Sequence, residues 1–89
     1  MAWKVELSNL ARKNLADMDL QHSRRILTFL QERVARLDNP RSIGEALKGS
    51  KLGEFWKYRI GDYRIISSIE DNALKILVVR IGNRKEVYK

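Results

Sequence analysis

Residues 47–66, LKGSKLGEFWKYRIGDYRII, decide the fold of this chain. They predict a basic loop, a strand, a tight turn and a second strand. Gly61-Asp62 is a two-residue hairpin signal, and this turn places Arg59 directly opposite Arg64. Like charges opposite each other destabilise a pair of strands. An anion bound between the two arginines would remove that cost, so we interpret the hairpin as a phosphate-binding surface.

Size and composition limit the possible functions. The chain has 89 residues, enough for one domain, and 44% of them are apolar, which suits a folded core. The net charge is +7, so the expected partner is acidic: nucleic acid, an anionic membrane or an acidic protein. Cysteine is absent, which excludes disulfides, thiolate metal sites and a cysteine nucleophile. The N-terminus has no long apolar run, so we expect no signal peptide or membrane span and a cytoplasmic location.

The residues before this stretch predict a strand and two helices. Ala2–Leu7 alternate between apolar and polar residues, as a half-buried strand does. Ser8 is placed to cap a short helix that ends near Met18, and Asp19 is placed to cap a longer one. Asn39-Pro40 stops the longer helix. That helix carries an apolar stripe at steps of three and four residues: Ile26, Leu27, Leu30, Val34 and Leu37.

The residues after the helices predict a loop and three strands. Arg41–Glu54 is expected to be a loop with one helical turn near Ile43–Leu47. The expected strands are Phe55–Ile60, Tyr63–Ile69 and Ala73–Ile81. The tail, Arg84–Lys89, is expected to be a short extra strand or an ordered arm. The fold class is therefore α+β, a two-layer sandwich of residues 1–89 in one domain. Its order is strand–helix–helix–three-strand meander, a mainly antiparallel sheet packed by a helical hairpin.

Several kinds of chemistry lack the residues that they need. His22 is the one histidine; we expect it to be an exposed surface residue, and a histidine-pair ribonuclease mechanism is excluded by count. We expect no metal and no cofactor, because no pair of acids stands at ligand spacing near that histidine. The glycines at 44, 49 and 53 match neither a phosphate-binding P-loop nor a dinucleotide-binding loop.

A set of cations with two tyrosines remains as the candidate site. Arginine binds phosphate oxygens in a forked geometry and stabilises charge that grows in a transition state. A lysine crowded by arginines, or a tyrosine near cations, could carry a proton. With RNA as substrate, the 2′-OH itself supplies the nucleophile. The set is Lys48, Lys51, Lys57, Arg59, Arg64, Arg84, Lys85, Tyr63 and Tyr88.

Composition and spacing leave alternatives open. The same cations could be ordinary surface charges on a binding module. Trp56 and Tyr58 alternate with Lys57 and Arg59, so they are expected to face the helices as part of the core. The other possibility is that they stack on single-stranded bases.

Three segments together resemble the RelE/ParE superfamily of bacterial toxins: residues 47–66, the following LKILVVRIG, and the terminal GNRKEVY. The likeness is greater to the RelE branch, the ribosome-dependent messenger-RNA interferases. Length and element order agree over nearly the whole chain. The resemblance implies a RelE-like toxin domain that cuts messenger RNA in the ribosomal A site, without metal, by 2′-OH attack that leaves a 2′,3′-cyclic phosphate.

The resemblance also implies residue roles. Tyr88 or Lys57 would be the general base, Arg64 would stabilise the transition state, Arg84 would serve the leaving group and Arg59 would hold the phosphate. Candidates for contact with RNA and the ribosome are Lys48, Lys51, Lys85, Arg12, Arg33 and Arg36. The implied partners are the 70S ribosome, mRNA and a cognate RelB-like antitoxin that is acidic in its toxin-binding segment. The toxin–antitoxin complex would bind operator DNA through the antitoxin, and no membrane is involved.

Two departures from the family pattern matter. Several relatives carry histidine where Asn83 stands, so proton transfer would fall more to Tyr88 and Lys57. Many relatives carry an aromatic residue where Ser67 stands. Two other functions stay open: a ParE-like inhibitor of DNA gyrase with the same fold, and a non-catalytic RNA-binding homologue.

Overall fold

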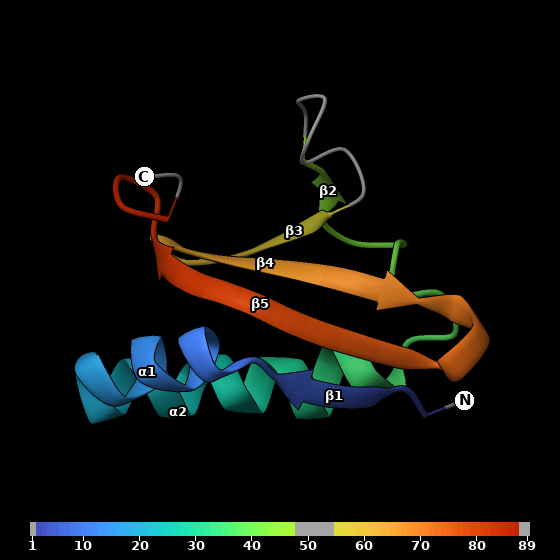
Figure 1. The fold of residues 1–89 in the computed structure, drawn as a ribbon, viewed down its shortest axis with the longest axis horizontal. Helices are drawn as coiled ribbons and strands as arrows, with labels where there is room; N and C mark the ends of the chain where they lie inside the picture. The colour runs from blue at the N-terminus through green and yellow to red at the C-terminus, as the bar shows by residue number, and fades with distance from the viewer. Residues whose placement is uncertain (1, 48–54, 88–89) are drawn as a thin grey trace.

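The computed structural model describes residues 2–47 and 55–87. A five-stranded sheet in the order β1-β5-β4-β3-β2 is covered on one face by a helical layer (Figure 1). The predicted α+β sandwich is confirmed. The elements are β1 (Lys4–Leu7), α1 (Asn9–Asp17), α2 (Leu20–Thr28), a π-helical turn (Phe29–Arg33), a 3-10 turn (Val34–Arg36), β2 (Glu45–Ala46), β3 (Trp56–Ile60), β4 (Tyr63–Glu70), a 3-10 turn (Asp71–Ala73) and β5 (Lys75–Asn83).

The helices form where the sequence predicts them. Ser8 caps α1: its Oγ accepts a hydrogen bond from the Ala11 N–H at 3.0 Å. Asp19 precedes α2 as its N-cap residue, but its side chain makes no capping bond. The longer helical segment ends at Leu37, which is extended. Its last two turns are π-helical and 3-10 rather than α, a difference that the apolar stripe does not reveal.

The sheet is a meander with one strand added at each edge. β3–β4 and β4–β5 are antiparallel, as predicted, and β1 joins β5 in parallel. The hairpin register is also confirmed, with Arg59 opposite Arg64 across the Gly61-Asp62 turn. The expected tail strand is not formed in the described part, because residues 84–87 make a turn. Tyr88 and Lys89 lie outside the described residues.

The prediction of a helical turn near Ile43–Leu47 is wrong. Glu45–Ala46 instead form β2, which pairs with β3 in antiparallel register. Gly44 has a φ of 80°, and a Cβ on it would overlap the Lys57 carbonyl oxygen. The close approach of β2 to β3 therefore requires glycine at this position, and the short strand is decided by contacts distant in sequence.

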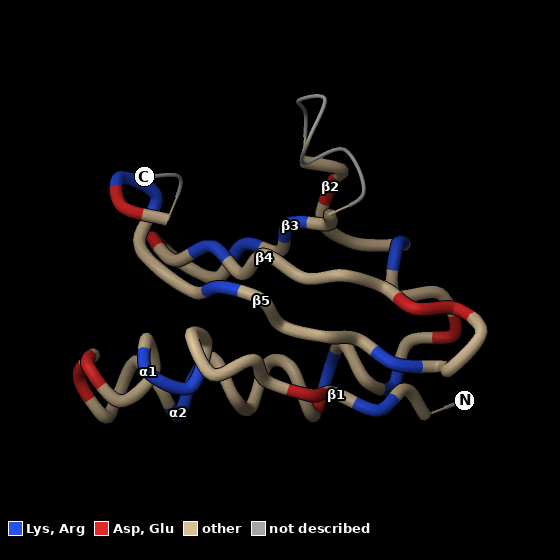
Figure 2. The backbone as a smooth tube through the Cα atoms, viewed as in Figure 1, with Lys and Arg blue, Asp and Glu red and all other residues tan. Residues whose placement is uncertain are grey.

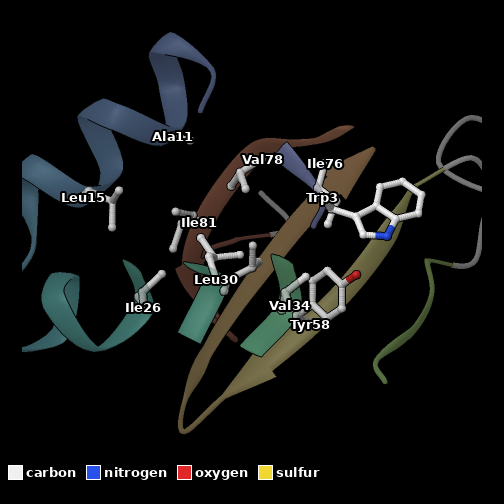
Figure 3. Close-up of a cluster of buried hydrophobic side chains, with 11 residues drawn as sticks. Trp3, Ala11, Leu15, Ile26, Leu30, Val34, Tyr58, Ile76, Val78 and Ile81 are labelled. Atoms are coloured by element: carbon white, nitrogen blue, oxygen red, sulfur yellow. The ribbon is translucent and has the colours of Figure 1, made fainter. Parts of the chain in front are cut away.

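The main core lies between the helices and the sheet (Figure 3). Tyr58 is fully buried, and its hydroxyl donates to the Pro40 carbonyl at 2.5 Å. Trp56 is partly buried, and its Nε1 donates to the Ile43 carbonyl at 2.8 Å. Both aromatics therefore face the core as predicted. The loop before β2 is further anchored by Arg41, which donates two hydrogen bonds to the Asp71 carboxylate.

Stability should fall at high pH because of Tyr58. Burial raises the pKa of Tyr58 to about 12, whereas an unfolded tyrosine titrates near 10. The unfolded state therefore loses its proton first, and folding should lose up to about 2 kcal/mol as the pH rises from 10 to about 12. Urea unfolding of the wild type and Tyr58→Phe across this range checks the expectation. Equal pH slopes for the two proteins would contradict it.

Candidate functional site

The face of the sheet opposite the helices carries two cross-strand rows of side chains. Strand alternation puts Tyr58 and Ile65 in the core and turns their neighbours to the other face. Figure 2 places basic residues on β3, β4 and β5 and in the turn after β5. The register defines one row as Lys57, Ile66 and Arg80, and the other as Arg59, Arg64 and Gly82. We call this surface the basic face.

Arg59 and Arg64 differ in exposure, although they lie opposite each other. Arg59 is exposed, whereas Arg64 is only 8% exposed. The Arg64 Nη1 donates to the carbonyls of Gly61 at 3.2 Å and Tyr63 at 3.0 Å. The turn carbonyls thus compensate part of the Arg64 charge and relieve the repulsion that the register alone suggests. Phosphate binding between the two arginines stays a prediction.

Lys57 has a carboxylate partner that the sequence does not reveal. Its Nζ lies 3.0 Å from Oε1 of Glu45, directly across from it on β2. The lysine side chain is 19% exposed and the glutamate side chain 54% exposed. The pair therefore places an accessible proton acceptor beside a cation at the edge of the basic face. Glu45 escaped prediction because its segment was expected to be a loop with a helical turn.

The turn after β5 brings Arg84 to the tip of the hairpin. The Arg84 N–H donates to the Asp62 carbonyl at 2.9 Å, and both Arg84 and Lys85 are exposed. Asp62, Asn83, Arg84 and Lys85 line a cavity of about 270 Å³. Two segments that lie far apart in sequence, the hairpin turn and the turn after β5, thus form one concave, basic surface.

A small apolar cluster adjoins the cations. Leu47, Ile66 and Val87 are buried, with Phe55 packed against them. Together with Leu10, Val79 and Arg80 they line a cavity of about 240 Å³. The basic face therefore combines charge with an apolar hollow, an arrangement that can receive both a phosphate backbone and an apolar group.

Three of the predicted RNA-contact residues lie away from this face. Arg12 is exposed on α1, and Arg33 and Arg36 are exposed near the end of the second helical segment. Arg36 pairs with Glu32 at 3.0 Å. All three belong to the helical layer on the other side of the sheet. Lys48, Lys51 and Tyr88 lie outside the described residues. Among the described candidates for RNA contact, only Lys85 lies beside Arg84.

Two further cations near the site were missed by sequence reasoning. Arg80 faces the basic face because the β4–β5 register shifts between Ile66 and Ser67, and strict alternation would have turned it to the core. Arg25 of α2 lies beside the hairpin turn, its Nη1 3.5 Å from the position of a Cβ on Gly61. Arg25 falls outside the apolar stripe that the helical period predicts.

His22 differs from the exposed residue that was expected. It is half-buried, and its ring centroid lies 5.2 Å from that of Tyr63. No group of three or more His, Cys, Asp or Glu side chains that could hold a metal occurs in residues 2–47 and 55–87. No described helix is long and apolar enough to cross a bilayer.

The sequence and the fold of the chain both match known toxins. A sequence profile of the ParE toxin of type II toxin–antitoxin systems, parDE, matches residues 5–88. No curated protein sequence gives a significant match. The toxin–antitoxin complex RelBE2 of Mycobacterium tuberculosis contains a chain of similar structure, with a TM-score of 0.85 and 21% identity over 97% of this chain and 95% of that chain.

Two further solved structures are similar. The archaeal RelE–RelB complex from Pyrococcus horikoshii gives a TM-score of 0.74 with 26% identity, over 97% of this chain and 99% of that chain. The isolated E. coli RelE toxin gives 0.70 with 19% identity, over 98% of this chain and 92% of that chain. With the profile match spanning nearly its whole length, the chain belongs to the ParE toxin family of type II toxin–antitoxin systems, in the RelE/ParE superfamily, and has the RelE-like fold.

Proposed function

We propose that this toxin is a metal-independent endoribonuclease that cleaves messenger RNA in the A site of the ribosome and so inhibits translation. The observation that carries the proposal is the Glu45–Lys57 pair beside the basic face. RNA cleavage by its own 2′-OH needs a proton acceptor next to cations that hold the phosphate. This surface supplies both kinds of group without a histidine.

The roles follow from charge and exposure. A lysine held by a carboxylate is a cation, so we assign phosphate binding to Lys57 and Arg59. Glu45 takes the 2′-OH proton, the 2′ oxygen attacks the phosphorus, and the bond to the 5′ oxygen breaks. Arg84 stabilises the departing oxygen, which takes a proton from water. The products are a 2′,3′-cyclic phosphate and a 5′-hydroxyl end.

Two predicted roles need further conditions. Arg64 can stabilise the transition state if its guanidinium exchanges the carbonyls of Gly61 and Tyr63 for a phosphate oxygen. Tyr88 as a general base stays a prediction, since it lies outside the described residues. Contacts of Lys85, Arg12, Arg33 and Arg36 with the ribosome also stay predictions.

The proposed partners follow from the family and the charge. Two of the compared structures are complexes with RelB antitoxins. A RelB-like antitoxin with an acidic binding segment would complement the +7 charge of this chain. Operator binding would then occur through the antitoxin, and the site of action would be the cytoplasm, where the ribosomes are.

Incubation of the purified toxin with translating 70S ribosomes and a defined message tests the proposal. Primer extension should reveal new 5′ ends at A-site codons, and message without ribosomes should stay intact. Arrest of protein synthesis with an uncut message would contradict the nuclease activity.

A ParE-like inhibitor of DNA gyrase is the second candidate, because the matching profile is that of the ParE toxin. Such a toxin needs no proton acceptor beside its cations. Inhibition of supercoiling by purified gyrase, together with intact message on ribosomes, would favour this function.

Glu45→Gln should lower single-turnover cleavage on ribosomes by on the order of 10²-fold, because it removes the general base but keeps the side-chain shape. The acidic limb of the pH–rate profile should disappear with it. Glu70→Gln is the matched control, since it also removes a carboxylate paired with a lysine, 3.6 Å from Lys75 and at the far end of β4. A Glu45→Gln enzyme with the wild-type rate would reject the assignment.

A further inference from the structure

Asn83 ends β5 and caps the turn that follows. Its side-chain Oδ1 accepts hydrogen bonds from the backbone N–H groups of Lys85 at 3.0 Å and Glu86 at 3.1 Å. Its carbonyl accepts from the N–H groups of Glu86 and Val87, both at 3.0 Å. One residue thus satisfies three consecutive backbone donors, and two of its four bonds depend on the side-chain oxygen.

The capped turn is held tightly against the sheet. The Arg84 N–H, next to Asn83, bonds to the Asp62 carbonyl on the neighbouring hairpin. A Cβ on Gly82 would lie 3.3 Å from the Cβ of Val87, so the chain folds directly back over this glycine. The backbone of Arg84 is therefore fixed on both sides. Its own N–H is bonded to Asp62, and the next two N–H groups are bonded to the Asn83 side chain.

The chemistry of the cap suits a neighbouring cation. An amide oxygen caps backbone N–H groups as well as a carboxylate does, yet it carries no charge. A carboxylate at this position would attract the Arg84 guanidinium and reduce its positive field. Asparagine provides the hydrogen bonds and leaves the charge of Arg84 available for an anion.

We propose that Asn83 is a positioning residue, which fixes the backbone of Arg84 beside the hairpin and thereby aims its guanidinium into the cavity of Asp62, Asn83, Arg84 and Lys85. The inference rests on the proposed function, because it concerns the group that stabilises the leaving oxygen. It gives Asn83 a role in catalysis without proton transfer.

Removal of the cap should affect turnover more than binding. In Asn83→Ala, single-turnover cleavage on ribosomes should fall by about tenfold to hundredfold, because a displacement of about 1 Å can cost that much. The toxin concentration that gives the half-maximal rate should change by less than about threefold, since the cations that bind RNA remain. Asn83→Ser keeps an oxygen acceptor and should restore the rate to within about threefold of wild type.

Hydrogen exchange of the backbone amides provides a second measurement that does not depend on activity. In Asn83→Ala, the amides of Lys85 and Glu86 should exchange faster with solvent, and Asn83→Ser should restore their protection. Asn72→Ala, in the exposed turn at the opposite end of β5, is the control and should match wild type in both measurements. Thermal unfolding identifies any variant that fails to fold.

The outcomes separate the two proposals. A wild-type rate in Asn83→Ala, or equal losses in the alanine and serine variants, would overturn the positioning role. Wild-type toxin that leaves the message intact would overturn the proposed function instead. The positioning role would then be decided by amide hydrogen exchange and by an NMR titration with inorganic phosphate. In the titration, the Arg84 Nε–H signal should shift less in Asn83→Ala than in wild type.

Discussion

Arg84→Ala should lower ribosome-dependent cleavage of messenger RNA by on the order of 10²-fold or more. The Arg84 side chain is exposed, and the bond that ties this residue to Asp62 is made by its backbone N–H, which alanine retains. The free energy of unfolding should therefore change by less than about 0.5 kcal/mol. Single-turnover primer extension and urea unfolding of the same preparation measure the two effects.

Arg24→Ala is the matched control for Arg84→Ala. Arg24 is also an exposed arginine, but it lies on α2 in the helical layer, so its removal changes the net charge equally. It should cleave within about threefold of wild type. Equal losses in the two variants would mean that overall charge, and not a group at the leaving oxygen, controls the rate. An unchanged rate in Arg84→Ala would reject the role of Arg84.

Gly44→Ala should destabilise the fold by about 3 kcal/mol. Its φ of 80° is strained for any residue with a Cβ, and the added methyl would overlap the Lys57 carbonyl and stand 2.8 Å from the Trp56 Nε1. Backbone cannot yield as a flexible side chain does, so β2 must move away from β3. The Glu45–Lys57 pair would then be lost, and cleavage should fall with stability.

Gly61→Ala shows how much of the cost of Gly44→Ala comes from backbone strain and how much from steric overlap. Gly61 also has a positive φ, of 58°, but a Cβ there would meet only the flexible end of Arg25 at 3.5 Å. Its cost should be about 1 kcal/mol, the strain alone. Urea unfolding of the two variants compares them directly. Equal costs would show that β2 adapts to the extra methyl group at Gly44.

Much of the fold follows from local patterns. The Ser8 cap, the stripe of Ile26, Leu30 and Val34, and the Gly61-Asp62 hairpin were all predicted from periods and turn residues, and all are confirmed. These features depend on residues that lie within a few positions of one another. Local geometry is therefore enough to predict them.

The candidate site was less accessible to sequence reasoning. Lys57, Arg59 and Arg64 were identified because they lie on the predicted hairpin. Glu45 was missed because β2 is two residues long, too short to show alternation. The loop before β2 is anchored by Trp56 and Tyr58, which donate to carbonyls 13 and 18 residues away, and no local pattern reveals these contacts.

The sequence by itself determined the basic charge, the two-layer order of elements and the hairpin that carries Arg59 opposite Arg64. Tertiary structure decided what that hairpin faces. A shift in the β4–β5 register turns Arg80 from the core side to the basic face, because one extra residue in a strand reverses the direction of all that follow. The pairing of β2 brings Glu45 to Lys57, and the fold of the turn after β5 against the hairpin brings Arg84 to Asp62. Each depends on a contact between segments distant in the chain, which no local period encodes.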